Sequence, residues 1–203
     1  MADRSDFLLK MYEQMFKDIE QAYTVVWQSV ASVFAAFAAI ALAEKGLVPI
    51  DFSLAIVLLV ITWFALNVLE CSYWYNRNLC IIANIERQFL IVDDLRNIQY
   101  YFGSHRPNKM ISHLQNQMFL AICLSATVLA YHFFDRVVPG LKESISQFDL
   151  VRALPYGVAG VCGMVLLRTQ RQRNVDYKEF LDHSPGIPVD TTGIRYGSGH
   201  GHK

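Results

Sequence analysis

Residues 51–70 read DFSLAIVLLVITWFALNVLE, an apolar run with a carboxylate at each end. No charged residue interrupts it between Asp51 and Glu70. An α-helix needs about 20 mostly apolar residues, with a lower limit near 17, to cross a hydrocarbon core roughly 30 Å thick. The run therefore predicts a membrane-spanning helix over residues 52–69.

Three further apolar runs accompany it, over residues 23–43, 118–134 and 153–167. The last is the shortest, since only 15 uncharged residues separate Arg152 from Arg168, but long arginine side chains can reach the interfaces at both ends. Gly46 and Pro49 suit a tight turn between the first two runs. We therefore expect an all-α integral membrane protein with four transmembrane helices, arranged as two hairpins.

The distribution of Lys and Arg predicts the orientation of these helices. Of the 18 Lys and Arg residues, 14 lie in the N-terminal segment, in the link between the second and third runs, or in the C-terminal tail. Cytoplasmic segments carry an excess of Lys and Arg, so both termini are expected in the cytoplasm and the protein in the cell membrane. One alternative stays open. Residues 41–43, Ala-Leu-Ala, resemble a signal-peptidase site, although the acidic segment before the run is unlike a signal peptide.

The segments outside the apolar runs carry helical patterns. The N-terminal residues 1–22 predict an amphipathic helix that leads into the first run. From Ser72 to Phe102 there is no Gly or Pro, and apolar residues recur every three or four positions. This predicts a cytoplasmic helix of about eight turns, roughly 45 Å long. Its apolar stripe can pack on the N-terminal helix, on a second copy or on a partner, and the residues expected at this interface are Ile82, Ile85, Phe89 and Val92.

The second pair of runs leads into another charged helix, from Arg168 to about Leu181, followed by a tail rich in Gly and Pro that is expected to be disordered. The predicted organisation is an N-terminal amphipathic helix, a first hairpin, a long cytoplasmic helix and loop, a second hairpin, and a C-terminal helix with its tail. These segments cover residues 1–22, 23–70, 71–115, 116–167 and 168–203.

Small residues line one face of two predicted spans, and this pattern is typical of close helix packing in lipid. The packing partner can be the same chain or another subunit. The residues are Ala31, Ala35, Ala39 and Ala43 in the first span, and Gly157, Gly160 and Gly163 in the fourth.

Polar side chains inside the spans are few, and none of the apolar runs contains Asp, Glu, Lys or Arg. This weighs against ion-coupled transport, which generally uses buried ionisable groups. Gln28 and Asn67 fall at the same end of an N-in hairpin, so we expect them to bond to each other, and we expect His132 in an interfacial aromatic belt. The polar residues proposed for a pore or for contacts between helices are Gln28, Ser29, Ser32 and Asn67.

No sequence motif indicates catalysis. The chain has no GxSxG, no HExxH and no glycine-rich phosphate loop, and its four cysteines have no CxxC spacing. We therefore expect a protein without a catalytic site, metal or cofactor. A formal net charge of zero also gives no basis for nucleic-acid binding.

The first hundred residues resemble the SLATT group of small bacterial membrane proteins. The resemblance is carried by the hairpin over residues 23–69 and by the aromatic-rich start of the next helix, Ser72-Tyr73-Trp74-Tyr75-Asn76-Arg77-Asn78. The second pair of spans departs from that group's two-span pattern and suits the four-span accessory membrane proteins found beside other bacterial defence genes. The resemblance implies an effector of anti-phage or conflict systems that oligomerises in the inner membrane and disrupts it once a cytosolic partner detects infection.

Three functional hypotheses follow. The first is a non-enzymatic inner-membrane effector or accessory subunit that forms homo-oligomers in the lipid bilayer, permeabilises it and responds to a cytosolic defence protein. The second is a structural membrane anchor that recruits a cytosolic enzyme or sensor through its cytoplasmic helix. The third is a transporter, against which the absence of charged residues in the spans argues.

Overall fold

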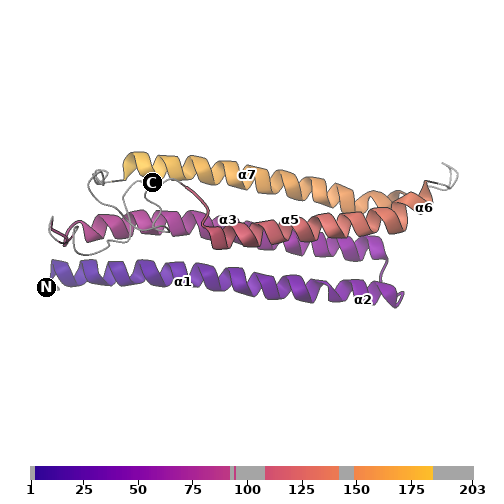
Figure 1. Ribbon diagram of the computed structural model, residues 1–203, viewed down its shortest axis with the longest axis horizontal. Coiled ribbons are helices and arrows are strands. Elements are labelled where there is room, and N and C mark those ends of the chain that lie inside the picture. The colour runs from indigo at the N-terminus through magenta and orange to yellow at the C-terminus, as the bar shows by residue number, and fades with distance from the viewer. Residues whose placement is uncertain (1–2, 92–93, 95–107, 142–148, 185–203) are drawn as a thin grey trace. The chain divides into compact units, whose positions relative to one another are not determined.

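The computed structural model describes residues 3–91, 94, 108–141 and 149–184, and over these residues the chain is helical and has no strands (Figure 1). The predicted all-α class is therefore confirmed for this part of the chain. The helical elements in chain order are α1 (Arg4–Ala36), α2 (Ala38–Glu44), α3 (Ile50–Glu86), α5 (Ser112–His132), the π-helical turn η1 (Phe133–Val137), α6 (Val138–Gly140), the 3₁₀ turn η3 (Leu150–Ala153) and α7 (Leu154–His183).

Four helical stretches of the described residues are long and apolar enough to cross a membrane, and each contains one of the predicted apolar runs. They are Arg4–Glu44, Ile50–Glu86, Ser112–Gly140 and Leu150–His183. The helix α3 has 37 residues, which is about 55 Å at 1.5 Å per residue. Since this exceeds a hydrocarbon core of roughly 30 Å, α3 has room for an apolar span and for a polar extension. The helices α1 and α7 likewise continue from an apolar run into a charged segment.

The predicted helix from Ser72 to Phe102 is interrupted after Glu86, over residues 87–91, and Asp94 is helical again. There α3 ends in a turn over residues 87–89, and Leu90 and Ile91 are not helical. The backbone N–H of Ile91 donates to the Asp94 carboxylate (3.0 Å). Such a local side-chain bond competes with the backbone bond that would continue the helix, because Asp offers the backbone an alternative acceptor. The remainder of the predicted helix and the C-terminal tail lie largely outside the described residues.

The link between the first two apolar runs contains a glycine, Gly46, that ends the helix α2. Gly46 adopts a φ of 70°, a left-handed conformation that glycine reaches without a Cβ clash. Its N–H donates to the carbonyl of Ala43 (2.8 Å), and the N–H of Leu47 donates to the carbonyl of Leu42 (3.1 Å). This pair of bonds is a Schellman motif, which satisfies carbonyls at the end of α2 and turns the chain toward α3.

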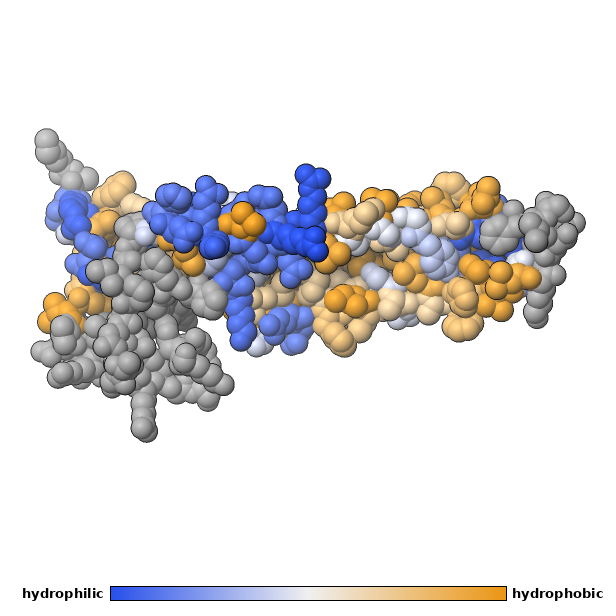
Figure 2. Space-filling model, turned by 90° about the horizontal axis from the view of Figure 1, so that it is seen from above, coloured by the Kyte–Doolittle hydropathy of each residue, from blue (hydrophilic) through white to orange (hydrophobic). Residues whose placement is uncertain are grey.

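Backbone contacts divide the chain into two compact units. We call residues 1–23, 71–109 and 173–203 the polar unit, and residues 24–70 and 110–172 the apolar unit. In the visible face of Figure 2, hydrophobic side chains gather over the helices of the apolar unit and hydrophilic ones over those of the polar unit. Charge and hydropathy thus change along single continuous helices.

In the apolar unit α3 is the most buried helix. In the apolar 18-residue stretch of α3, 50% of the residues are buried, against 11–22% in the corresponding stretches of the other three candidate spans. Leu54, Ile61 and Phe64 are fully enclosed, whereas large apolar side chains such as Phe34 on α1 and Phe119 on α5 face outward. Large apolar side chains that face outward from a helical unit suit a lipid environment.

The polar unit packs α1 and α7 against different faces of α3. Leu79, Ile82 and Ala83 form a buried cluster that is covered by α1 side chains including Tyr12 and Phe16. A second cluster joins Tyr73 and Cys80 of α3 to Tyr177 of α7. The apolar stripe of α3 is therefore used within the chain.

Candidate functional site

The small residues predicted to pack helices lie mainly on outward surfaces. Ala31, Ala35, Gly157 and Gly160 are exposed, and Ala39, Ala43 and Gly163 are half-buried. A Cβ placed on any of the three α7 glycines would meet no atom within 4 Å. The described part of the chain therefore does not use the glycine face of α7 for its own packing.

The predicted polar residues do not converge on a path through the single chain. The Ser29 hydroxyl donates to the carbonyl of Val26 (2.7 Å) and the Ser32 hydroxyl to that of Gln28 (3.2 Å), so both are satisfied by their own helix. The expected bond from Asn67 to Gln28 does not form, because Asn67 Nδ2 is buried and donates to no group in the described residues. The Gln28 side chain is exposed instead.

The residues predicted for the cytoplasmic helix interface divide into three groups. Ile82 and Ile85 are buried, and Ile82 belongs to the cluster that packs on α1. Phe89 follows the end of α3 and is 49% exposed. Val92 lies outside the described residues.

A buried polar network, which the sequence did not reveal, joins α3, α5 and α7 within the apolar unit. His132 is fully buried and Asp51 is 2% exposed. His132 Nε2 lies 2.8 Å from Asp51 Oδ1, and His132 Nδ1 lies 3.1 Å from the Tyr156 hydroxyl. Arg136 adds a contact of 3.5 Å from its Nη2 to Asp51 Oδ2. We call Asp51, His132, Arg136 and Tyr156 the Asp51–His132 network.

Local structure explains how these groups meet. Asp51 is in the first turn of α3, where a carboxylate interacts favourably with the helix dipole. His132 is the last residue of α5, and Arg136 lies in the π-helical turn that follows. Single π-helical turns inside helices are frequent at functional sites. Tyr156 comes from the first turn of α7, so the network ties together three helix ends.

Both ring nitrogens of His132 can be hydrogen-bonded whether the ring is an imidazole or an imidazolium. The Tyr156 hydroxyl lies 3.4 Å from the carbonyl of Leu129 as well as near His132 Nδ1. If the hydroxyl donates to Nδ1, the neutral ring donates from Nε2 to Asp51. If the hydroxyl donates to Leu129, Nδ1 donates to the Tyr156 oxygen, and the imidazolium still donates to Asp51. Exchange between the two patterns therefore requires rotation of one hydroxyl together with the gain or loss of one proton at His132 Nδ1.

Sequence reasoning missed this network for an identifiable reason. The sequence places Asp51 at the boundary of a span and predicts His132 in an aromatic belt, because each lies at the end of an apolar run. A signal was present, since buried ionisable residues in membrane segments usually pair with one another. The two residues are 81 positions apart, however, and only the packing of α3 against α5 brings them together.

The fold and network define a class: a protein whose described residues are helical, with four helices among them long and apolar enough to cross a membrane and a buried ionisable pair in its apolar unit. The chain matches no protein-family model, no curated protein and no solved structure.

Proposed function

We propose that the chain is a multi-pass protein of the bacterial inner membrane, with its four apolar helices arranged as two hairpins and both termini in the cytoplasm. The outward apolar side chains of the apolar unit support insertion into lipid. The location of 14 of the 18 Lys and Arg residues in three segments on one side of such an arrangement supports the orientation.

Within this membrane, we propose that the protein acts as a non-enzymatic homo-oligomeric effector or accessory subunit of a defence system. One observation carries the oligomer: the glycine face of α7 is open, with nothing within 4 Å of a Cβ at Gly157, Gly160 or Gly163. Lipid tails give no hydrophobic drive for helices to associate, so small residues that allow close backbone approach are favoured at helix interfaces. The defence role is supported by the resemblance to the SLATT group.

The α1 face supports permeabilisation by the same oligomer. Gln28, Ala31 and Ala35 are all exposed and are spaced three and four residues apart, so they share one helix face. Association through this face brings the Gln28 amides of several copies together. A polar path would then exist in the assembly and not in the single chain.

The mass of the protein in mild detergent tests the oligomer, measured by light scattering with the detergent contribution subtracted. We expect a discrete assembly of several copies, reduced in copy number by the double substitution Gly157→Leu and Gly160→Leu. Leu is a better helix former than Gly and both positions are exposed, so these changes leave the single chain folded. Ile122→Phe enlarges an exposed apolar side chain of α5 and is the matched control. A monomeric wild type, or equal copy numbers in both variants, contradicts the proposal.

Expression in cells tests permeabilisation separately. We expect growth inhibition and depolarisation from the wild type, and less depolarisation from Gln28→Leu at unchanged oligomer mass. An unchanged membrane potential in cells that contain the wild-type oligomer would reject a pore and leave an accessory role.

A second candidate function, the membrane anchor, is favoured by apolar side chains exposed on the polar unit. Phe7 and Leu9 of α1 are 61% and 55% exposed, and Val175 of α7 is 60% exposed. Since Ile82 and Ile85 belong to the core, they are unsuitable for testing recruitment. Phe7→Ser with Leu9→Ser is the better test. An anchor predicts that this double variant loses a co-purifying cytosolic protein and keeps its membrane insertion, whereas an effector predicts unchanged depolarisation.

A further inference from the structure

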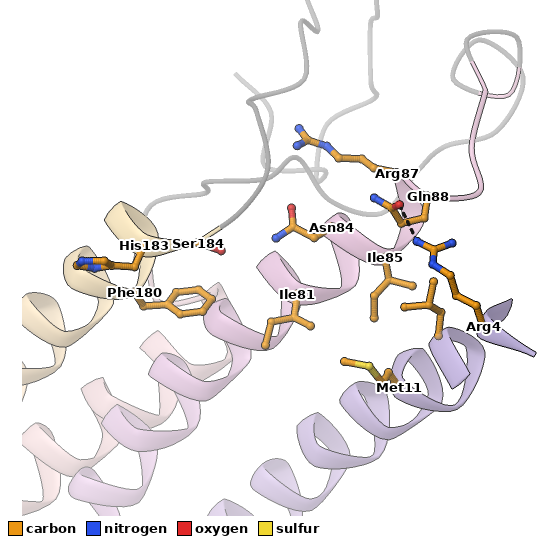
Figure 3. Close-up of a pocket in the computed structure, with 11 residues that line it drawn as sticks. Arg4, Met11, Ile81, Asn84, Ile85, Arg87, Gln88, Phe180, His183 and Ser184 are labelled. Atoms are coloured by element: carbon orange, nitrogen blue, oxygen red, sulfur yellow. Dashed lines mark hydrogen bonds between the residues drawn. The ribbon is translucent and has the colours of Figure 1, made fainter. Parts of the chain in front are cut away.

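A cavity of about 480 Å³ lies in the polar unit, between the start of α1 and the ends of α3 and α7 (Figure 3). Its volume falls within the range of small-molecule sites, roughly 300–1,000 Å³. Its wall consists of side chains from all three helices and the residues that directly follow α3 and α7. A molecule bound there would touch each helix of the polar unit.

Apolar side chains form the inner wall of the cavity. Met11 extends from α1 toward Ile81 and Ile85 of α3, and Phe180 extends from α7 (Figure 3). An apolar wall with a few polar groups at one edge is typical of sites for small organic molecules. The wall therefore favours a ligand with an apolar body.

The polar edge of the cavity is cationic. Arg4 and Arg87 contribute to the lining together with His183, and none of the described residues that line the cavity is Asp or Glu. Arg4 Nη2 donates to Gln88 Oε1 (3.1 Å), the bond drawn in Figure 3. An amide oxygen is neutral, so this bond does not neutralise the positive charge of Arg4. The charge at this edge is complementary to an anion.

Helix stability accounts for the positions of Arg87 and His183 but not for that of Arg4. Arg87 directly follows α3, and His183 is the last residue of α7, where its Nδ1 lies 2.8 Å from the carbonyl of Glu179. Cations stabilise the C-terminal ends of helices, which carry partial negative charge. Arg4 instead begins α1, at an end where a cation is unfavourable. Helix stability therefore does not account for its position beside the cavity.

We propose that this cavity binds a small organic anion, with its apolar body against Met11, Ile81 and Phe180 and its anionic group against Arg4 and Arg87. The ligand comes from water and not from the bilayer, because Arg4 precedes the apolar run of α1 by 19 residues. By touching α1, α3 and α7 together, the anion stabilises the packing of the polar unit. This inference is independent of oligomerisation.

Naphthalene-1-sulfonate is a suitable probe because it joins a rigid apolar body to one negative charge. Its binding to the full-length protein in nanodiscs of phosphatidylcholine is measured by saturation-transfer NMR, with empty nanodiscs subtracted. The cation naphthalen-1-ylmethylammonium has the same ring system and the opposite charge. We expect saturable binding of the sulfonate and none of the ammonium.

Two substitutions then locate the site. Arg4→Gln should raise the Kd of the sulfonate about tenfold, as expected for the loss of one charged hydrogen bond. Lys10→Gln removes an exposed positive charge from the same helix outside the cavity and should leave the Kd unchanged. Met11→Trp fills the cavity and should abolish binding, with circular dichroism as the check on its folding. Absence of saturable binding, equal binding of both probes, or equal effects of the Arg4 and Lys10 changes would overturn the proposal.

Discussion

The Asp51–His132 network makes a quantitative prediction for the variant Asp51→Ala. This change removes the 2.8 Å bond to His132 Nε2 and leaves a fully buried imidazole without its carboxylate. Removing one partner of a buried pair typically costs 3–5 kcal/mol, because the other is left unsatisfied. The contact with Arg136 adds little, since that side chain is 36% exposed and exposed pairs contribute roughly 0–1 kcal/mol. We expect the free energy of unfolding to fall by about 3 kcal/mol.

Reversible unfolding in mixed micelles, with increasing SDS and circular dichroism as the readout, measures this change. His132→Ala should cost a similar amount, and the double variant should cost less than the sum of the two single changes. A coupling energy of about 2 kcal/mol is consistent with a direct pair. Tyr156→Phe should cost about 1 kcal/mol, the value of one neutral hydrogen bond.

Asp135→Ala is the matched control, because Asp135 is exposed and follows α5 within a few residues of His132. We expect it to have little effect on unfolding. If Asp51→Ala costs no more than Asp135→Ala, or if the Asp51 and His132 costs simply add, the two side chains do not form a buried pair and the network is refuted.

Three further predictions follow from the fold. Gly160→Ala should stabilise the isolated chain by roughly 0.5–1 kcal/mol, because Ala is the better helix former and its Cβ meets no atom within 4 Å. The same change should weaken association, as measured by light scattering. Destabilisation of the monomer would show that the glycine packs within the chain. Ile82→Ala should lower the free energy of unfolding by about 2–4 kcal/mol, because Ile82 is fully buried, whereas an exposed position such as Val175→Ala should change it little. Gly46→Ala should cost about 1 kcal/mol in the same assay, because the φ of 70° disfavours a side chain, and a neutral effect would mean that this helix end relaxes.

Much of the fold was predictable because long apolar runs and helical periodicity are local signals. All four runs lie in helices, and α1 and α7 continue into their charged segments as expected. The end of α3 at Glu86 was not predictable from periodicity, since the apolar pattern continues past it and the bond from Ile91 to Asp94 is a specific local competitor. Which face of a helix is buried also escaped prediction, because in an apolar run both the core and the lipid accept apolar side chains.

The candidate sites were less predictable for a related reason. Small-residue spacing identified a face of α7 without showing whether the chain itself covers it, and only the open space around Gly157 and Gly160 shows that it does not. The pairing of Asp51 with His132 depends on how two distant helices pack. The cavity beside Arg4 depends on where three helices end, and helix ends are the least predictable feature of an apolar sequence.

The positions of these features suggest a division of roles among the helices of the apolar unit. Apolar contacts alone specify helix pairing poorly in a bilayer, because lipid tails compete for the same surfaces. The Asp51–His132 network supplies directional bonds between α3, α5 and α7, and these can fix which helices pair and in which register. With this anchor for internal pairing, the exposed glycines of α7 and alanines of α1 would be available to another copy in the proposed oligomer. A protein that used its small residues to hold its own helices would lose this surface, so the network and the open faces are best understood together.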